Sequence, residues 1–362
     1  MVPKPDAIPM DRSGRLTEPL RRASAAILGR AWQAGRGCHW DGGVLLDGGP
    51  VWCQPERLPK VRGAAMKATA RPRADATIML ADGRALAYCE WGDPTGSPVL
   101  LVHGGPGSRL LCPDEDATVA AGVRLLTVDR PGYGGSAPRP DPTLLDWADD
   151  VQALADRLGL ERFAVVGFSA GGGYALACAA RMPERISAVG LASCEGPYDE
   201  VPDALDQGMT PEERTLFERI RRDPTAARLA VAEHVAWYQD PDTIWEWEPP
   251  AVDVPILARP DVREALTLMF REGARQGVGG LVDDWIALSL PWGLDLAEVQ
   301  MPVVVCHSDI LGAITARAET KDPTANRGEH GGRVTPQYDH LSGDHRAPQR
   351  DDASVVRRPG SS

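Results

Sequence analysis

The sequence predicts an α/β fold, in which helices cover both faces of a mostly parallel sheet. From about residue 76 onward, apolar runs of strand length alternate with helical patterns, which is typical of such a sheet. Between about 196 and 292 the pattern changes to helical stretches with no buried strand, which indicates an inserted helical lid.

The elements are expected in a definite order. The stretch 76–91 reads as two short strands joined at Asp82-Gly83, a dipeptide that readily adopts the positive φ angles of a tight turn. The further strands are predicted at 98–103, 123–129, 162–168, 186–193 and 301–307. Helices are predicted at about 114–122, 143–158 and 170–182, with a short one near 17–33.

The same patterns divide the chain into regions. Residues 1–65 are rich in Gly, Pro and Arg and are expected to form a poorly ordered extension, so that Met66 is the hypothetical functional start of the domain. The predicted regions are a core of 66–195 and 293–345, a helical cap of 196–292 and a disordered tail of 346–362.

Composition narrows the class of protein. The chain has 362 residues, of which 43% are hydrophobic and 25% charged, as in ordinary soluble globular proteins. Acidic residues (51) outnumber basic ones (39), and a net charge of -12 repels phosphate backbones and anionic membranes. We therefore expect a small-molecule substrate, with no nucleic acid and no membrane as partner; the oligomeric state stays open.

The cysteines and the apolar runs bear on localisation. The seven cysteines form no CxxC pair and show no metal-ligand spacing, so we expect no metal site and a reducing, cytoplasmic environment. No run approaches the roughly 18 apolar residues that cross a bilayer, and the start lacks the flanks of a signal peptide. Neither membrane anchoring nor export is expected.

Gly167-Phe168-Ser169-Ala170-Gly171 lies between a β-rich run and an Ala-rich helix former. A cramped strand-to-helix turn of small residues lifts a serine hydroxyl clear of the sheet. The N-terminus of the following helix then supplies N–H groups that favour negative charge. This pattern predicts Ser169 as a nucleophile; the alternative is a glycine-rich connection without a role.

Two further glycine-rich turns follow predicted strands. The segment 103–108, HGGPGS, would let backbone N–H groups approach a substrate closely, so we expect Ala170 and Gly105 to be the oxyanion-hole donors, with Gly104 as the alternative. His103 is expected to brace this loop through hydrogen bonds. The segment 129–136, DRPGYGGS, alone indicates only a loop.

Together the three motifs resemble the α/β-hydrolase family, in the family's order, over about 76–309. HGGPG is similar to the proline iminopeptidase branch, whereas DRPGYGGS and GFSAGG look more like general esterases. The resemblance implies an eight-stranded, mostly parallel sheet with a helical cap after the sixth strand. It also implies a Ser, Asp/Glu, His triad in chain order and no cofactor.

The resemblance implies an acid just after the strand at 301–307, where the nearest carboxylate is Asp309; Glu195 is an alternative. It implies a base in a small-residue turn followed by Leu, which YDHLS at 338–342 matches with His340. His345 and His330 remain alternatives, since the residues after about 310 give poor versions of the family's last helices and strand.

These residues predict a serine hydrolase that cleaves a small or medium carboxylic ester, or an amide, through an acyl-enzyme. The alternatives are a catalytically impaired protein of the same fold that binds a ligand, and an iminopeptidase-like aminopeptidase. The lid holds aromatic residues that would line an apolar pocket or form lid core, and acidic residues that would bind an amine end or lie on solvated helix faces. They are Trp237, Tyr238, Trp245, Trp247 and Trp285, and Glu246, Glu248, Asp283 and Asp284.

Overall fold

The computed structural model of the protein describes the ranges 42–46, 49–53, 71–194, 196–197, 209–246 and 254–306. The chain divides into two compact units, 1–321 and 322–362, and every described residue belongs to the first. The predicted helix near 17–33 and the predicted tail lie outside the described residues.

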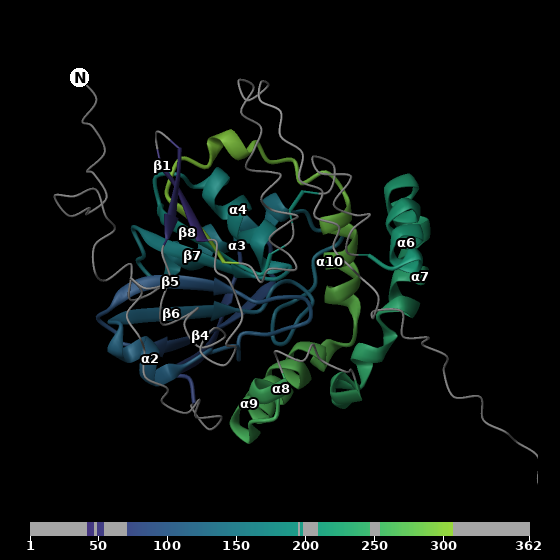
Figure 1. The fold of residues 1–362 in the computed structure, drawn as a ribbon, viewed down its shortest axis with the longest axis horizontal. Coiled ribbons are helices and arrows are strands. Elements are labelled where there is room, and N and C mark those ends of the chain that lie inside the picture. Colours follow the sequence, from purple (N-terminus) through teal and green to yellow (C-terminus); the bar gives the residue numbers. More distant parts are fainter. Residues whose placement is uncertain are drawn as a thin grey trace, which may run out of the picture. The chain divides into compact units, whose positions relative to one another are not determined.

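The described strands form one sheet in the order β2-β1-β9-β8-β7-β5-β6-β4-β3 (Figure 1). The five central strands, from β9 to β6, run parallel, and antiparallel strands flank them on both sides. The strands are β1 (Gly42–Leu46), β2 (Gly49–Cys53), β3 (Ala74–Met79), β4 (Ala85–Gly92), β5 (Ser97–Val102), β6 (Val123–Val128), β7 (Phe163–Phe168), β8 (Ile186–Ala192) and β9 (Val303–Cys306). Each strand predicted after residue 70 is confirmed to within two residues at either end.

The number of described strands differs from the eight that the resemblance implies. Seven described strands follow residue 70, and two more precede it, in a segment for which the sequence predicted no strand. In that segment β1 pairs with β2 from Gly42 opposite Cys53 to Leu46 opposite Gly49, and it also pairs with β9. Each of these two strands has only five residues, so the sequence shows no sustained hydrophobic period from which they could be predicted.

The turn between β3 and β4 has the predicted geometry. Gly83 adopts φ +85°, a left-handed angle that glycine reaches without steric cost, and its N–H donates to the Leu80 carbonyl at 3.0 Å. The two strands therefore form the hairpin that Asp82-Gly83 predicted.

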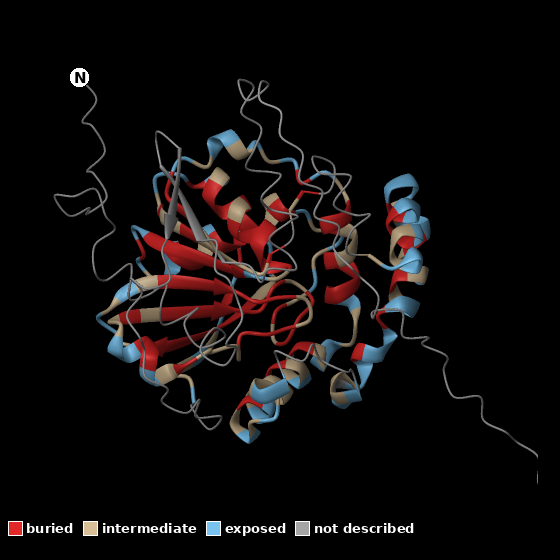
Figure 2. Cartoon of the chain, viewed as in Figure 1, coloured by how far each residue is buried: buried red, intermediate tan, exposed pale blue. Residues whose placement is uncertain are grey.

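Most residues of the central strands β5, β6 and β7 are buried, and Figure 2 colours them red. Along β5, Leu100 and Val102 belong to one apolar cluster, whereas Val99 and Leu101 belong to a second one, because successive side chains of a strand point to opposite faces. The helices over 144–157 and 171–181 contribute to the first cluster, and the shorter helix over 115–120 packs against β4 and β6 near the second. Burial on both faces explains why these strands read as continuous apolar runs.

The helices of the core are α2 (Glu115–Ala120), α3 (Leu144–Arg157) and α4 (Gly171–Arg181), together with the 3₁₀ turn η5 (Leu296–Glu298). The helices α3 and α4 pack side by side and contribute to the first cluster (Figure 1). The helix α3 begins with a capping box, in which the Thr143 hydroxyl accepts from the Asp146 N–H and the Asp146 carboxylate accepts from the Thr143 N–H. The three helices predicted for this part are confirmed.

Between β8 and η5 the described residues form helices and no strand. They are α6 (Pro211–Arg222), α7 (Pro224–His234), η2 (Ala236–Gln239), η3 (Pro241–Glu246), α8 (Val254–Leu257), α9 (Pro260–Gly273), η4 (Ala274–Gln276) and α10 (Gly279–Ser289). Leu216, Val231 and Leu281 from three of these helices share an apolar cluster with Tyr133 of a core loop. This is the insertion that the sequence predicted, and we refer to it as the cap; its predicted limits, 196–292, stay a prediction.

Within the described part of the chain, the helices are too short or too polar to cross a lipid bilayer.

Candidate active site

Ser169 occupies the turn between β7 and α4, where the sequence predicted a nucleophile. Its φ of +51° lies in the left-handed region, which non-glycine residues seldom adopt. The Ser169 N–H donates to the Ala192 carbonyl at 2.9 Å, and the Ser169 carbonyl accepts from the Gly172 N–H at 2.9 Å. These two bonds hold the serine in its strained backbone conformation, half-buried, at the end of a central strand.

The glycines around Ser169 are required by close backbone approach. A Cβ atom at Gly167 would lie 2.5 Å from the Gly171 carbonyl oxygen, and one at Gly171 would lie 2.4 Å from the Val102 carbonyl oxygen. Neither backbone oxygen belongs to a flexible side chain that could turn away. The G-x-S-x-G pattern therefore has a local steric cause in this fold.

The loop that follows β5 lies against this turn. A Cβ atom at Gly104 would be 3.1 Å from the Ser169 Cβ, and one at Gly105 would be 3.5 Å from the Ala170 Cβ. Ala170 itself is buried and directly precedes α4, where the N–H groups of an α-helix lack intrahelical acceptors. The structure thus brings together Ser169 and all three predicted donors, Ala170, Gly105 and Gly104.

Both ring nitrogens of His103 form hydrogen bonds with backbone groups. Its Nδ1 lies 2.7 Å from the Gly104 carbonyl oxygen, and its Nε2 lies 3.2 Å from the Arg130 backbone nitrogen. A carbonyl only accepts and an N–H only donates, so Nδ1 carries the proton and Nε2 accepts. Burial, and then the charge of Arg130, lower the pKa of His103 well below 6.5. The predicted bracing role of this histidine is confirmed.

Beside this loop lies a buried ionic cluster that joins the core to the cap. Asp284, on α10, accepts from the Arg130 guanidinium, from the Tyr133 hydroxyl at 2.5 Å and from the Tyr174 hydroxyl at 2.7 Å. The guanidinium carbon also lies 4.7 Å from the centre of the Tyr174 ring. The sequence did not predict this cluster, since Arg130 and Asp284 are 154 positions apart and no spacing connects them.

The predicted acid and base are not placed. Asp309, His340 and the alternatives Glu195, His330 and His345 all lie outside the described residues. The described part of the chain contains two histidines, His103 and the exposed His234 at the end of α7. The roles of Asp309 and His340 therefore stay predictions.

The lid aromatics take different positions. Tyr238 is buried and donates to the Phe270 carbonyl at 3.1 Å, and Trp285 stacks edge-on with Phe217, their ring centres 5.6 Å apart. Trp237, in contrast, is 42% exposed. Tyr238 and Trp285 therefore belong to the cap core.

Trp245 donates from its ring nitrogen to the Thr267 hydroxyl at 3.0 Å and carries the Arg263 guanidinium over its ring at 3.9 Å. It too packs within the cap. Trp247 lies outside the described residues.

The two buried lid carboxylates are both paired within the protein. Asp284 is engaged as described above, and Asp283 accepts from the Arg228 guanidinium at 2.5 Å. Each of the two carboxylates is thus neutralised by an arginine. Glu246 is exposed at the end of η3, and Glu248 lies outside the described residues.

Part of the chain is similar to known proteins. Residues 97–255 match the family model described as "alpha/beta hydrolase fold". A proline iminopeptidase of Xylella fastidiosa is 31% identical over 196 residues, which is 46% of this chain and 58% of that protein. A non-heme chloroperoxidase of Streptomyces lividans is 33% identical over 158 residues, 42% of this chain and 55% of that protein. The chain thus spans less than two thirds of these relatives.

A solved structure of an α/β hydrolase fold protein from Nakamurella multipartita is also similar, with 25% identity and a TM-score of 0.44 over 68% of this chain and 86% of that one. A hydrolase from Pseudomonas aeruginosa gives 20% identity and a TM-score of 0.46 over 68% and 95%.

Proposed function

We propose, on the premise that the chain belongs to the α/β-hydrolase family, that it is a serine hydrolase. Its substrate would be a small or medium carboxylic ester, or an amide, and the reaction would pass through an acyl-enzyme on Ser169. The observation that carries the proposal is the position of Ser169, held at φ +51° beside Gly104, Gly105 and Ala170.

In the proposed reaction the Ser169 oxygen attacks the carbonyl carbon of the substrate, and a histidine accepts the hydroxyl proton. The negative charge that develops on the carbonyl oxygen is held by the N–H groups of Ala170 and Gly105. The C–O or C–N bond then breaks, and the leaving group takes the proton from the histidine. Water, deprotonated by the same histidine, then attacks the acyl carbon. The bond from that carbon to the Ser169 oxygen breaks, the acid is released, and the histidine returns its proton to the serine.

The base proposed for this reaction is His340, oriented by Asp309. His103 is unsuited to that role, because both of its ring nitrogens have backbone partners. Serine is a weak nucleophile without a base, so the proposal requires that one of the tail histidines reaches Ser169.

An ester is the better candidate substrate than an N-terminal proline amide. The relatives include proline iminopeptidases, which favours the second candidate, an aminopeptidase. Binding of a free amine calls for an unpaired carboxylate, however, and the buried lid carboxylates Asp283 and Asp284 are already paired with Arg228 and Arg130.

The test is covalent labelling with a fluorophosphonate probe. We expect the wild type to be labelled and Ser169→Ala to lose all labelling. Ser193→Ala is the matched control, because Ser193 follows the neighbouring strand β8 and also has a positive φ, of 50°. Absence of labelling in folded wild type would overturn the catalytic proposal and favour a catalytically impaired, ligand-binding protein.

Two further measurements refine the proposal. Hydrolysis of p-nitrophenyl butyrate and of proline p-nitroanilide divides an esterase from an aminopeptidase. Substituting His340, His345 and His330 one at a time by Ala identifies the base, and we expect His340→Ala alone to abolish labelling.

A further inference from the structure

We propose that Asp284, on the cap helix α10, is a positioning residue that fixes the oxyanion loop through Arg130. The inference rests on the proposed function, which it deepens by adding two residues that act on the backbone donors without contacting the substrate. The oxyanion hole would then be ordered only when the cap is packed against the core.

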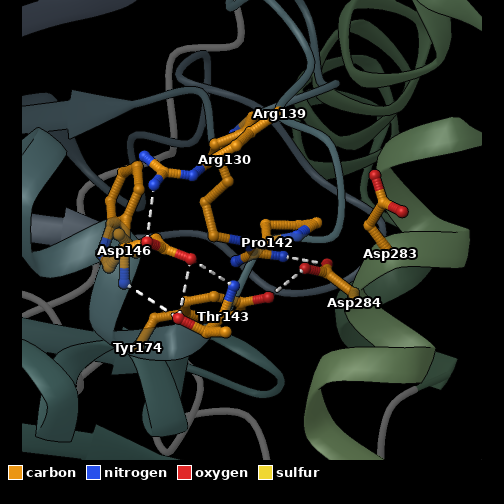
Figure 3. Close-up of a pocket in the computed structure, with 10 residues that line it drawn as sticks. Arg130, Arg139, Pro142, Thr143, Asp146, Tyr174, Asp283 and Asp284 are labelled. Carbon is orange, nitrogen blue, oxygen red and sulfur yellow. Dashed lines mark hydrogen bonds and ion pairs between the residues drawn. The ribbon is translucent and has the colours of Figure 1, made fainter.

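The Asp284 carboxylate is held at three points. One oxygen accepts from the Arg130 guanidinium and from the Tyr133 hydroxyl at 2.5 Å. The other accepts from the Tyr174 hydroxyl at 2.7 Å, and Figure 3 shows Asp284 between Arg130 and Tyr174. Burial, with the charge of Asp284, raises the pKa of both phenols well above 10, so both remain neutral donors. All of these side chains are buried, which makes the cluster rigid.

Arg130 connects this rigid cluster to the oxyanion loop by hydrogen bonds. Its side chain is buried, and its guanidinium donates to the His103 carbonyl and, at 3.3 Å, to the Gly104 carbonyl. The Gly104 carbonyl also accepts from His103 Nδ1 at 2.7 Å. Two consecutive peptide groups of the oxyanion loop are therefore held by their oxygen atoms.

Because a peptide group is planar, a fixed carbonyl oxygen also fixes the direction of the N–H group in the same peptide. In a trans peptide the carbonyl of one residue and the N–H of the next point in opposite directions. When Arg130 holds the Gly104 oxygen, it sets the direction of the Gly105 N–H, and its bond to the His103 oxygen does the same for the Gly104 N–H. Both candidate donors thus depend on one guanidinium.

The guanidinium in turn depends on the cap. A buried Arg is costly unless a counter-ion neutralises it, and Asp284 is the carboxylate that does so. Asp284 also lies against the loop, because a Cβ atom at Gly105 would be 3.1 Å from its oxygen. If Asp284 loses its charge, Arg130 loses the partner that keeps it facing the two carbonyls.

The main test compares Asp284→Asn with Asp283→Asn. The two residues are neighbours on α10 and both are buried in ion pairs, but Asp283 pairs with Arg228 of the cap. A misaligned oxyanion hole weakens binding of the transition state more than it weakens binding of the substrate. Asp284→Asn should therefore lower kcat for p-nitrophenyl butyrate by about 10-fold to 100-fold and change KM by less than about 3-fold. Asp283→Asn should keep kcat within about 2-fold of wild type.

A second readout does not depend on activity. Hydrogen exchange of the amides in 103–108 should be faster in Asp284→Asn than in wild type and unchanged in Asp283→Asn, at a temperature where both variants are folded. Arg130→Lys should reproduce the faster exchange, since an ammonium group cannot span two carbonyls as the planar guanidinium does.

The outcomes separate the two proposals. If the fluorophosphonate probe does not label the wild type but the amides of 103–108 exchange faster in Asp284→Asn, the catalytic function is overturned. The positioning role of Asp284, which we call the clamp, is then supported. Unchanged kcat and unchanged exchange in folded Asp284→Asn would overturn the clamp. A rise in KM with unchanged kcat would also overturn it, because that result assigns Asp284 to substrate binding.

Discussion

Arg130 and His103 hold each other through both backbone and side chain. The Arg130 N–H donates to His103 Nε2 at 3.2 Å, while the Arg130 guanidinium donates to the His103 carbonyl. The pair joins the ends of the strands β5 and β6, which are neighbours in the sheet. This arrangement requires an uncharged imidazole, because a doubly protonated ring has no acceptor for the Arg130 N–H.

The neutral state of His103 makes stability depend on pH. Its pKa lies well below 6.5 in the folded protein, so below about pH 6.5 the unfolded chain binds a proton that the folded one does not. The free energy of unfolding should therefore fall as the pH falls from 7 to 5, by up to about 2 kcal/mol from this residue alone. Urea denaturation at the two pH values measures the difference.

His103→Gln should show a smaller loss between pH 7 and pH 5 than the wild type, whatever its stability at pH 7. His234→Gln, which removes an exposed histidine and retains His103, is the control and should still lose stability between pH 7 and pH 5. An identical pH dependence in wild type and His103→Gln would contradict the neutral state assigned to this ring.

Removal of Arg109 should destabilise the protein strongly. Its guanidinium contacts Asp129 at 2.7 Å, Asp75 at 2.8 Å and Glu272 of α9 at 2.5 Å. The Asp129 side chain is fully buried, so Arg109→Met would leave its charge without a counter-ion and should cost about 3–5 kcal/mol in the free energy of unfolding. Urea denaturation at neutral pH measures this loss.

Arg271→Met is the matched control for Arg109. Arg271 pairs with Asp242 at 2.8 Å, and both side chains are more than half exposed, so its loss should cost about 1 kcal/mol or less. Adding Asp129→Asn to Arg109→Met should recover part of the stability. Equal costs for the two arginine variants would show that burial of Asp129 does not govern the effect.

Two adjacent glycines at the start of α10 should respond differently to alanine. A Cβ atom at Gly280 would lie 2.7 Å from the Tyr133 ring, whereas one at Gly279 would meet no atom within 4 Å. Gly280→Ala should therefore cost about 1–3 kcal/mol, because Tyr133 is packed on all sides. Gly279→Ala should be neutral or stabilising by up to about 1 kcal/mol.

Thermal unfolding of both variants measures this difference. Gly280→Ala should also lower kcat, since the added methyl group would push Tyr133 away from Asp284. Equal melting temperatures for the two variants would show that the contact between Gly280 of α10 and the Tyr133 ring is looser than in this structure.

The sequence predicted the local features of the core well. The hairpin at Gly83, the strands and helices after residue 70 and the turn at Ser169 each have a cause within a few neighbouring residues, such as a positive φ or an alternation of apolar side chains. His103 could be predicted for the same reason, because its loop follows directly in the sequence.

Features that depend on distant contacts were not predictable in this way. The sequence left Asp284 with two alternatives, binding of an amine end or a place on a solvated helix face, but the structure buries it and pairs it with Arg130 of a core loop. The lid aromatics were ambiguous because a cluster of Trp and Tyr reads the same whether it lines a pocket or fills a cap. The acid and base, Asp309 and His340, rest on the family's pattern alone.

The hydrogen bonds between β1 and β9 have a consequence for truncated forms of the protein. A chain shortened to begin at Met66 would lack the strand that runs antiparallel to Val303 and Val304. A sheet edge without its partner strand is a template for pairing with another molecule. Such a shortened protein should self-associate more readily as its concentration rises, even where each copy folds as before.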